Sequence, residues 1–470
     1  MEIIHISAEC YPFAKVGGLA DVVGALPKYQ NKLGHIAKVV VPAYHTKFLA
    51  ENEFEIAYDA WANYGNHHFP YRVLKEKTNK LGFDLYAVDI QGLTDRPNVY
   101  GYHDDTERFI AFQIAVLDWI VQWEHRPDII HCHDHHTGLI PFMVSNSVKY
   151  QSISDVPTVL TIHNAQYQGQ FGWNKLYYLP AFDLWKSGLL EWNNDINPLA
   201  AAIKCAWRVT TVSPSYLEEM MYNARGLDGL LRQERGKCVG ILNGIDSEVW
   251  NPETDPLLNK GYNLRTVESG KAANKKALCD VFQLDDSKPL FTFIGRLVDE
   301  KGADLLPDIF HTALHHHGDE INVLVLGSGE DWVEGRLNQL KDYFYGKYNC
   351  YIGYNEKVSH EIYAGADFLL MPSRVEPCGL NQLYALRYGT VPIVRRIGGL
   401  KDTVVDIGDD GFGICHDQTS VWDVTQSINR AIELYKDKKR FKAIRKTMMK
   451  IDHSWDRAAL NYIQLYQILK

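Results

Sequence analysis

The sequence lacks the features that mark disulfide-rich, membrane-spanning and nucleic-acid-binding chains. Its eight cysteines are scattered singly, with no Cys-x-x-Cys pair, which argues against a disulfide framework or a structural zinc site and for reduced thiols in the cytoplasm. No apolar run reaches the roughly 18 residues of a membrane helix, and the first residues contain no basic leader, so we expect neither a membrane span nor a signal peptide. The net charge is −9, so the chain lacks the general attraction to phosphate backbones that nucleic-acid binders need.

At 470 residues the chain is longer than one hydrophobic core usually supports, and about two to three domains are expected. Short β-branched runs alternate with amphipathic segments from end to end, a pattern typical of parallel sheets covered by helices. We therefore predict an α/β chain of two doubly wound, Rossmann-like domains, residues 1–243 and 244–454, with the seam at a turn-forming Asn-Gly pair. A last amphipathic helix, 455–470, is expected either to complete the second domain or to cross back onto the first.

Ligands of doubly wound sheets bind at the carboxyl ends of the strands, so chemistry is expected in the loops there. After the predicted strand Glu2–Ser7 comes Lys15-Val16-Gly17-Gly18-Leu19-Ala20-Asp21-Val22. A mobile ammonium ahead of two glycines that open a helix suits an anionic ligand that approaches the backbone closely. The spacing matches neither a Walker loop nor Gly-x-Gly-x-x-Gly, and the alternative is a tight turn with a solvated lysine.

Two further strand ends in the first half carry histidines. Asp134 follows the predicted strand Ile129–His131 with two histidines on each side. Alternate side chains of an extended segment face opposite ways, which disfavours a metal site; Asp134 is then either a helix N-cap or a carboxylate that binds hydroxyls. His163-Asn164 follows the predicted strand Val159–Ile162 and offers donors and acceptors for a neutral polyhydroxy ligand, the alternative being a structural histidine.

Two cations follow a predicted strand at Leu290–Ile294 in the second half. Arg296 stands at the strand end, and Lys301 comes five residues later, where the next helix is expected to begin. An arginine fork and a lysine point charge beside a helix N-terminus suit a diphosphate. The alternative is that Asp299 and Glu300 pair with these cations on the surface.

A carboxylate loop follows the predicted strand Phe368–Met371. Its sequence is Glu376-Pro377-Cys378-Gly379-Leu380-Asn381. The Glu376 carboxylate is placed to accept from sugar hydroxyls while the backbone amides of Gly379 and Leu380 face the ligand. A similar glycine-rich loop, Arg395-Arg396-Ile397-Gly398-Gly399, follows the next predicted strand.

Taken together, four motifs resemble the signatures of the bacterial glycogen synthase and plant starch synthase family. They are Lys15 to Val22, Thr161-Ile162-His163-Asn164, Gly295-Arg296 with Lys301-Gly302, and Glu376 to Leu380. The resemblance covers nearly the whole chain in the right order. It implies the GT-B fold, in which two doubly wound domains face a deep cleft, and the transfer of glucose from ADP-glucose to the non-reducing 4-hydroxyl of an α-1,4-glucan such as glycogen, with retention of anomeric configuration. It implies no cofactor, no metal, no nucleic acid and no membrane partner.

The resemblance also implies roles for residues of the first domain, which would take the acceptor side. Lys15 resembles a lysine that binds the donor, and Gly18 a glycine whose backbone contacts the diphosphate. His163 resembles the histidine that contacts the transferred glucose, and Asp134 the acid of the family's His-Asp loop. Further substrate-binding residues implied in this domain are Asp21, Asn164 and Asn243.

In the second domain, which would bind the nucleotide sugar, the resemblance assigns the leaving diphosphate to Arg296 and Lys301. Glu376 resembles the glutamate that orients the glucose, and Tyr354 the aromatic residue on which adenine stacks. Further substrate-binding residues implied in this domain are Gly379, Leu380 and Asn381. Two positions, Val16 and Asn381, carry residues typical of plant starch synthases where many bacterial members have Thr, and Tyr384 stands where wider relatives have a second glutamate.

The leaving diphosphate gains negative charge as the glycosidic bond breaks, and fixed cations stabilise that charge in the transition state. Hydrolytic retaining enzymes use two carboxylates about 5 Å apart, and no such pair is evident in these loops. We therefore predict a front-face transfer, in which the departing phosphate deprotonates the incoming hydroxyl and no covalent glycosyl-enzyme forms. The alternatives are a sucrose or trehalose-phosphate type of transferase, a nicotinamide oxidoreductase, and a non-enzymatic glucan-binding protein; the residues also leave UDP-glucose open as the donor.

Overall fold

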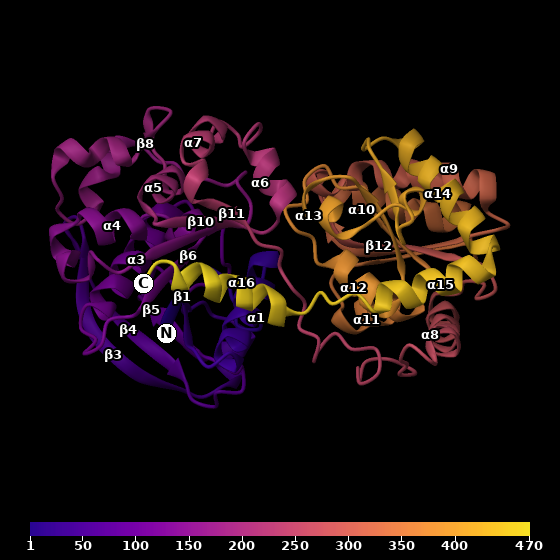
Figure 1. Ribbon diagram of the computed structural model, residues 1–470, viewed down its shortest axis with the longest axis horizontal. Helices are drawn as coiled ribbons and strands as arrows, with labels where there is room; N and C mark the ends of the chain where they lie inside the picture. The colour runs from indigo at the N-terminus through magenta and orange to yellow at the C-terminus, as the bar shows by residue number, and fades with distance from the viewer. The chain divides into compact units, whose positions relative to one another are not determined.

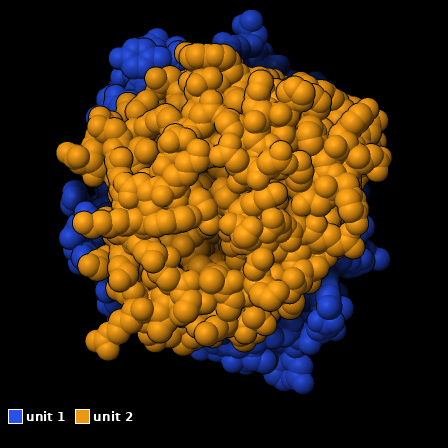
Figure 2. Space-filling model, turned by 90° about the vertical axis from the view of Figure 1, so that its right-hand side faces the viewer, with its two compact units in different colours: residues 1–243, 455–470 blue, residues 244–454 orange.

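Two separate β-sheets, each covered by helices, organise the chain (Figure 1). The computed structural model describes residues 1–470. They divide into unit 1, Met1–Asn243 with Trp455–Lys470, and unit 2, Gly244–Ser454, which Figure 2 distinguishes by colour. Each unit encloses its own clusters of buried apolar side chains. None of the helices combines the length and apolar character that crossing a bilayer requires.

Unit 1 contains a nine-stranded sheet in the order β11-β10-β7-β6-β1-β2-β5-β4-β3. Its strands pair in parallel except at the β4–β5 and β3–β4 pairs, which are antiparallel. The strands are β1 (Glu2–Ile6), β2 (Ile36–Pro42), β3 (Phe54–Tyr64), β4 (His67–Glu76), β5 (Asp84–Asp89), β6 (Ile129–His133), β7 (Thr158–Ile162), β10 (Arg208–Thr211) and β11 (Cys238–Gly240). A separate small hairpin joins β8 (Glu191–Trp192) and β9 (Asp195–Ile196). The parallel strands β1, β6 and β7 are buried almost throughout, as strands covered on both faces should be.

The last helix of the chain belongs to unit 1. Trp455, Tyr462 and Tyr466 of this helix share one buried cluster with Ile3 and Leu26, so the C-terminal segment packs on the first helix (Figure 1). The helices of unit 1 are α1 (Gly18–Lys32), α2 (Lys47–Glu51), α3 (Asp105–Ile120), α4 (Ile140–Asn146), α5 (Pro198–Cys205), α6 (Pro214–Met220), α7 (Asp228–Gln233) and α16 (Trp455–Gln467).

Unit 2 contains a six-stranded sheet in the order β14-β13-β12-β15-β16-β17, parallel throughout. Its strands are β12 (Leu290–Leu297), β13 (Asn322–Gly329), β14 (Tyr348–Ile352), β15 (Phe368–Met371), β16 (Val391–Arg395) and β17 (Ile414–His416). Its helices are α8 (Val267–Phe282), α9 (Leu306–His317), α10 (Asp331–Tyr343), α11 (Glu356–Gly365), α12 (Asn381–Tyr388), α13 (Gly398–Thr403), α14 (Val421–Lys436) and α15 (Lys438–Met449).

The strand orders place the predicted loops together. In unit 1 the chain adds strands first on one side of β1, beginning with β2, and later on its other side, beginning with β6. In unit 2 it likewise adds β13 on one side of β12 and later β15 on the other. Such a switch point opens a crevice at the carboxyl ends of the strands. The loops after β1, β6 and β7 therefore meet at one edge of the first sheet, and the loops after β12, β15 and β16 meet at one edge of the second.

The predicted α/β class with two doubly wound sheets is confirmed, but several elements differ from expectation. The predicted helix 137–150 is a 3-10 turn, the short helix α4 and a second 3-10 segment, because Pro141 and Ser147 interrupt a regular path. The antiparallel hairpin β3–β4 and the helices α8 and α15 were not predicted. Lys301 ends a 3-10 turn at Asp299–Lys301, and α9 begins only at Leu306, so the expectation that this lysine opens a long helix is wrong.

Candidate active site

The loop after β1 is held in shape by a buried glutamate. The carboxylate of Glu9 accepts hydrogen bonds from the backbone N–H groups of Val16 at 2.6 Å and Gly17 at 2.9 Å, and from the Tyr100 hydroxyl at 2.6 Å. Burial raises the pKa of Glu9, against the lowering effect of these three bonds. A carboxylate that accepts consecutive N–H groups fixes the course of the backbone there, so Glu9 preorganises the start of α1.

The predicted residues of this loop lie together at its surface. Lys15 Nζ contacts Asp21 Oδ1 at 2.7 Å, and the lysine side chain is a little over one third exposed. A Cβ atom added at Gly17 or at Gly18 would meet no protein atom within 4 Å. Packing within the protein therefore does not require these glycines, and the space beside them is free for a ligand to approach the backbone at the N-terminus of α1.

Asp134, directly after β6, adopts a strained backbone conformation. Its φ of 57° and ψ of −174° lie in a region that is otherwise almost confined to glycine. Its side chain makes no N-cap hydrogen bond; instead its Oδ1 accepts from the backbone N–H groups of His163 at 2.7 Å and Asn164 at 3.5 Å. The capping alternative is therefore wrong. Asp134 joins the β6 and β7 loops, and strain of this kind is typical of functional sites.

Burial raises the pKa of Asp134 to about 7, against the lowering effect of the His163 and Asn164 amides. The native state then binds a proton between about pH 4 and 7 that the unfolded chain has already released, so this carboxyl group makes the protein less stable as pH rises through that window. We expect Asp134→Asn to remove the effect. The unfolding free energy of the variant minus that of the parent should increase from pH 4 to 7 by up to roughly 4 kcal/mol and then level off.

Urea unfolding at a series of pH values measures this difference, and the other titrating groups cancel in it because both proteins contain them. A difference that is constant with pH would show that Asp134 is ionised throughout.

His163 lies beside Asp134 and is buried, and burial lowers its pKa to about 3. Its Nε2 contacts His133 Nδ1 at 3.0 Å, and its Nδ1 makes no hydrogen bond within the protein. The neighbouring Asn164 uses its side-chain oxygen to accept from the Gln166 N–H at 3.0 Å. Asn243 follows β11, which β10 separates from β7 in the sheet; its Oδ1 is buried and has no hydrogen-bond partner in the protein. The structure thus brings Asp134, His163 and Asn164 together.

In unit 2 one of the two predicted cations contacts the predicted glutamate. Lys301 Nζ contacts Glu376 Oε1 at 2.6 Å, and the second carboxylate oxygen accepts from the Ser373 hydroxyl at 2.9 Å. Arg296 is half-exposed and has only a loose ion pair with Glu300, at 3.4 Å. The surface-pairing alternative therefore holds for Arg296 in part but not for Lys301. Glu376 is buried, whereas both cations retain exposed surface toward which an anion can approach.

The backbone after Glu376 is shaped by two neighbouring segments. The Asn381 side-chain amide donates to the Ile294 carbonyl at 2.8 Å, which ties this loop to the middle of β12. Leu380 directly precedes α12, so its amide and that of Gly379 stand at a helix start. A Cβ at Gly398 would lie 2.0 Å from the Glu376 carbonyl oxygen. The glycine-rich loop after β16 therefore packs directly against the carboxylate loop, and this close contact requires a glycine at position 398.

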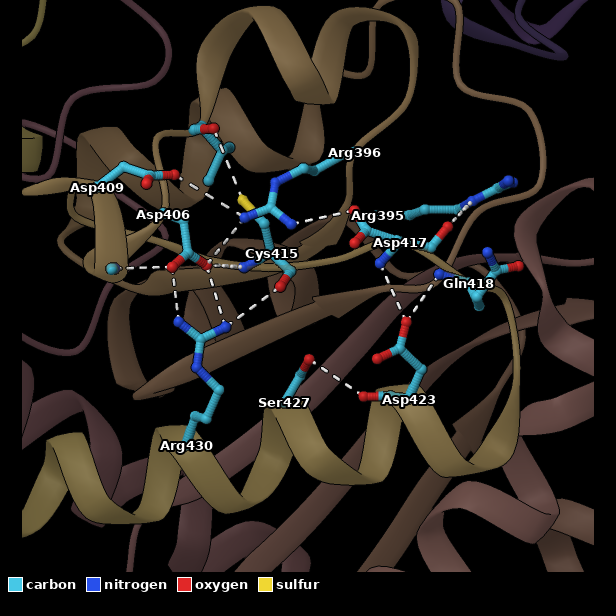
Figure 3. Close-up of polar contacts among 12 residues, drawn as sticks. Arg395, Arg396, Asp406, Asp409, Cys415, Asp417, Gln418, Asp423, Ser427 and Arg430 are labelled. Atoms are coloured by element: carbon cyan, nitrogen blue, oxygen red, sulfur yellow. Dashed lines mark hydrogen bonds and ion pairs between the residues drawn. The ribbon is translucent and has the colours of Figure 1, made fainter.

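The arginines of that glycine-rich loop are fixed by acids of neighbouring segments (Figure 3). Arg396 contacts Asp417 at 3.0 Å and lies 3.9 Å from Asp406. Asp406 also receives two hydrogen bonds from Arg430 of α14, at 2.6 and 3.1 Å. Arg395 donates to the backbone carbonyl of Asp417 at 3.0 Å. These contacts anchor the segment that supports Glu376, so the two arginines have a structural use.

Two aromatic residues differ sharply in their surroundings. Tyr354 follows β14 and the residue is 72% exposed, so a planar ligand can reach its side chain from solvent. Tyr384 on α12 is buried, and its ring stacks on Trp250 at 3.7 Å between centroids, with His360 on the opposite face of Trp250 at 3.9 Å. Where wider relatives have a second glutamate, this chain therefore has a packing residue.

Sequence reasoning missed three residues that shape these sites: Glu9, Tyr100 and Ser373. Glu9 and Ser373 stand within the loops that were identified, and an acid between a strand end and paired glycines is a signal that could have been used. Tyr100 lies about 90 residues from its partner and carries no local signal.

The chain is similar to known proteins over its whole length. Residues 2–233 match the family model described as starch synthase catalytic domain, and residues 274–448 match the model described as glycosyl transferases group 1. The chain is 60% identical over 469 residues to a glycogen synthase of Flavobacterium johnsoniae, which covers 100% of this chain and 99% of that protein. It is 39% identical over 485 residues to a glycogen synthase of Geobacillus stearothermophilus, covering 100% and 98%.

Solved structures agree with the sequence relatives. The catalytic domain of starch synthase IV from Arabidopsis thaliana, bound to ADP and acarbose, superposes with a TM-score of 0.91 at 30% identity, covering 100% of this chain and 99% of that chain. Sucrose-phosphate synthase from Thermosynechococcus elongatus superposes with a TM-score of 0.65 at 17% identity, covering 99% and 98%. The second likeness extends to the fold alone.

Proposed function

The chain belongs to the family of bacterial glycogen synthases and plant starch synthases, and on that premise we propose that it transfers glucose from ADP-glucose to the non-reducing 4-hydroxyl of an α-1,4-glucan, with retention of anomeric configuration. Membership of a glycosyltransferase family sets aside the oxidoreductase and the non-enzymatic glucan-binding protein. The predicted GT-B fold is confirmed by the likeness to starch synthase IV.

The observation that carries the proposal is the contact of Lys301 with Glu376 at the switch point of the second sheet, with Arg296 near the carboxyl end of β12. The relative of known structure that holds ADP and acarbose has the same fold, and a diphosphate and a sugar are what two cations and a carboxylate suit. In the proposal Arg296 and Lys301 bind the diphosphate, Glu376 accepts from glucose hydroxyls, and the exposed Tyr354 ring stacks on adenine. The start of α12, with Gly379, Leu380 and Asn381, lines the same donor site.

The residues of unit 1 bind the donor phosphates and the transferred sugar in this proposal. Lys15 and the backbone at Gly18 contact the donor phosphates, since a lysine and free helix amides both favour anions. His163 contacts the transferred glucose, and Asp134 fixes the backbone that carries it. Further polar contacts to substrate come from Asp21, Asn164 and Asn243.

The chemistry requires one bond to break and one to form on the same face of the sugar. The bond from the anomeric carbon to the phosphate oxygen breaks, and its electron pair stays on the diphosphate, where Arg296 and Lys301 stabilise the growing charge. The acceptor oxygen bonds to the anomeric carbon and gives its proton to the departing phosphate. The Glu376 carboxylate is held by Lys301 and Ser373, which supports a role in binding and not as a covalent nucleophile. Trapping a glycosyl group on any side chain during turnover would contradict this route.

Transfer of radiolabelled glucose tests the proposal. We expect label from ADP-glucose to enter glycogen, with a higher kcat/KM than from UDP-glucose, and proton NMR of an extended maltooligosaccharide to show a new α-linkage. Fructose 6-phosphate and glucose 6-phosphate should accept no label. Transfer to a hexose phosphate would favour the sucrose or trehalose-phosphate alternative, and faster transfer from UDP-glucose would overturn the assigned donor.

The open space beside Gly18 leads to a further prediction. Because a Cβ there meets no protein atom, Gly18→Ala should leave the melting temperature unchanged or slightly higher, since alanine is the better helix former. It should nevertheless raise the KM for ADP-glucose, because the methyl group occupies the space assigned to the diphosphate. Gly335→Ala on α10, where a Cβ also meets nothing, is the matched control and should leave the KM unaltered. Equal KM values in all three proteins would remove Gly18 from the donor site.

A further inference from the structure

A line of buried imidazoles runs beneath His163 in unit 1. His5 Nδ1 contacts His133 Nε2 at 3.0 Å, and His133 Nδ1 contacts His163 Nε2 at 3.0 Å. His131 stacks on His133 with 4.3 Å between ring centroids. These rings come from β1, β6 and the end of β7, which are neighbours in the sheet. The transfer chemistry uses His163 alone, so the other three histidines need an explanation.

A hydrogen-bonded chain explains them better than a metal ion does. Nitrogen atoms of His5, His131 and His133 all lie within 4.8 Å of one another, as a bound ion would require. However, both nitrogens of each ring already have a partner: Gln30 on His5, Tyr466 and Thr161 on His131, and the neighbouring imidazoles otherwise. No nitrogen in this group is left to bind a metal.

Which atom donates in each of these hydrogen bonds follows from a backbone carbonyl at one end of the series, because a carbonyl oxygen can only accept. Thr210 donates its hydroxyl proton to the Leu160 carbonyl at 3.3 Å, so it accepts from the Thr161 hydroxyl at 2.6 Å. Thr161 in turn accepts from His131, whose Nε2 lies 2.6 Å away and therefore carries the proton. The Nδ1 of the neutral His131 is then an acceptor, and the Tyr466 hydroxyl donates to it at 2.6 Å.

From Tyr466 the donors and acceptors can be assigned in the same way as far as His163. The Tyr466 oxygen accepts from the Gln30 side-chain NH₂ at 3.4 Å, which directs the Gln30 oxygen toward His5 Nε2 at 2.8 Å. His5 therefore carries its proton on Nε2 and accepts at Nδ1 from His133. By the same reasoning His133 accepts at Nδ1 from His163. His163 is left protonated on Nε2, with a bare Nδ1.

We propose that Tyr466 is a positioning residue for glucosyl transfer, because through Gln30, His5 and His133 it holds His163 in the tautomer whose bare Nδ1 accepts a hydroxyl proton of the transferred sugar. The inference rests on the role given to His163 in the proposed function. It explains why the last helix, α16, packs on unit 1 with a buried tyrosine hydroxyl against the histidines.

The burial of the rings supports a chain of neutral imidazoles. Burial lowers the pKa of His5 to about 4 and that of His163 to about 3, and it holds the pKa values of His131 and His133 well below their usual range. Each ring therefore carries one proton at neutral pH, as an ordered chain requires. The tautomer of the last ring is then decided by hydrogen-bond order and not by titration.

Nitrogen NMR of the full-length protein with ¹⁵N-labelled histidine tests the tautomer directly, without substrate. We expect His163, assigned by loss of its signals in His163→Gln, to show a protonated Nε2 and a bare Nδ1 at neutral pH. Tyr466→Phe removes the hydroxyl that orients the Gln30 side chain. The Gln30 amide can then rotate and present its NH₂ group to His5, so the His163 signals should move toward an average of both tautomers. Thr210→Val removes the anchor at the other end of the chain and should cause the same change.

Kinetics give the second readout. We expect Tyr466→Phe to lower kcat about three- to tenfold, the worth of one neutral hydrogen bond, with the KM for ADP-glucose unchanged. Tyr462→Phe is the matched control, because it removes a phenol hydroxyl from the same buried face of α16 outside the chain of bonds. It should change neither the spectrum nor kcat.

Three results would overturn the inference: a proton on Nδ1 of His163 in the parent protein, an unchanged His163 spectrum in Tyr466→Phe, or a stoichiometric transition metal in the purified protein. Failure of the proposed function has a different signature, because the parent protein would then transfer no glucose to glycogen while its histidine spectrum still showed the expected tautomer.

Discussion

Replacing Lys301 with alanine is expected to lower kcat for glucosyl transfer by about 10²- to 10³-fold, the loss typical of removing one fixed donor to a developing oxyanion. The lysine is only partly exposed and lies 2.6 Å from Glu376, so its ammonium is held in place before the substrate arrives. The charge on the leaving diphosphate is larger in the transition state than in the bound donor. The substitution should therefore lower kcat more than it raises the KM for ADP-glucose.

The removal of Lys301 also takes away the cation that pairs with the buried Glu376 carboxylate, which keeps its hydrogen bond from Ser373, so folding must be measured beside activity. Initial rates with glycogen and a thermal melt of the same preparation separate the two effects. Arg296→Ala should fall in the same range of kcat with little change in stability, because Arg296 is half-exposed and has only its loose pair with Glu300. Lys276→Ala, at an exposed pair on α8, is the control. Turnover near that of the parent in both Arg296→Ala and Lys301→Ala would disprove the role of these cations.

The sequence pattern was sufficient to predict which loops lie together, and the reason is physical. Alternating buried strands and amphipathic helices specify parallel sheets, and a parallel sheet places all its strand ends at one edge. Loops as distant in the chain as those of Arg296 and Glu376 could therefore be assigned to one site before any distance was known. The contact of 2.6 Å between Lys301 and Glu376 agrees with that assignment.

What could not be predicted depends on contacts between distant side chains. From the sequence, Asp134 could be either a helix N-cap or a carboxylate that binds hydroxyls. The capping alternative is excluded only by contacts in the structure, where the carboxylate accepts from the distant His163 N–H. The histidine of β1 shows no function in its own motif, because its partners are 25 and 128 residues away in sequence. The hairpin β3–β4 pairs antiparallel at the sheet edge with many of its residues exposed, so it lacks the continuous apolar run by which the buried strands were found.

The second large effect concerns stability and arises at the opposite ends of the strands in unit 2. Asp367 directly precedes β15 and is buried between Lys275 at 2.7 Å and Arg445 at 2.5 Å. Its Oδ2 also accepts from the Leu290 N–H at 2.9 Å, at the start of β12. One carboxylate therefore joins α8, α15 and the first residues of the central strand. Replacing it removes the acid partner of the buried Lys275, while Arg445 keeps its longer pair with Glu268 at 3.3 Å.

Asp367→Asn is expected to lower the free energy of unfolding by about 3–5 kcal/mol, as breaking one side of a buried ion pair does. Urea denaturation at neutral pH measures it, and Asp280→Asn, at an exposed pair on α8, should cost less than about 1 kcal/mol.

The same carboxylate predicts how the parent protein responds to acid. Burial alone would raise the pKa of Asp367, but Lys275 and Arg445 outweigh it and hold the pKa below its usual value. The unfolded chain then binds a proton at a higher pH than the native state does, so the stabilisation is complete above about pH 4 and is lost as pH falls through the native pKa. The stability difference between parent and Asp367→Asn should accordingly shrink in acid. A difference that stays constant from neutral pH down to strong acid would mean that the variant is weakened by altered packing and not by the loss of charge.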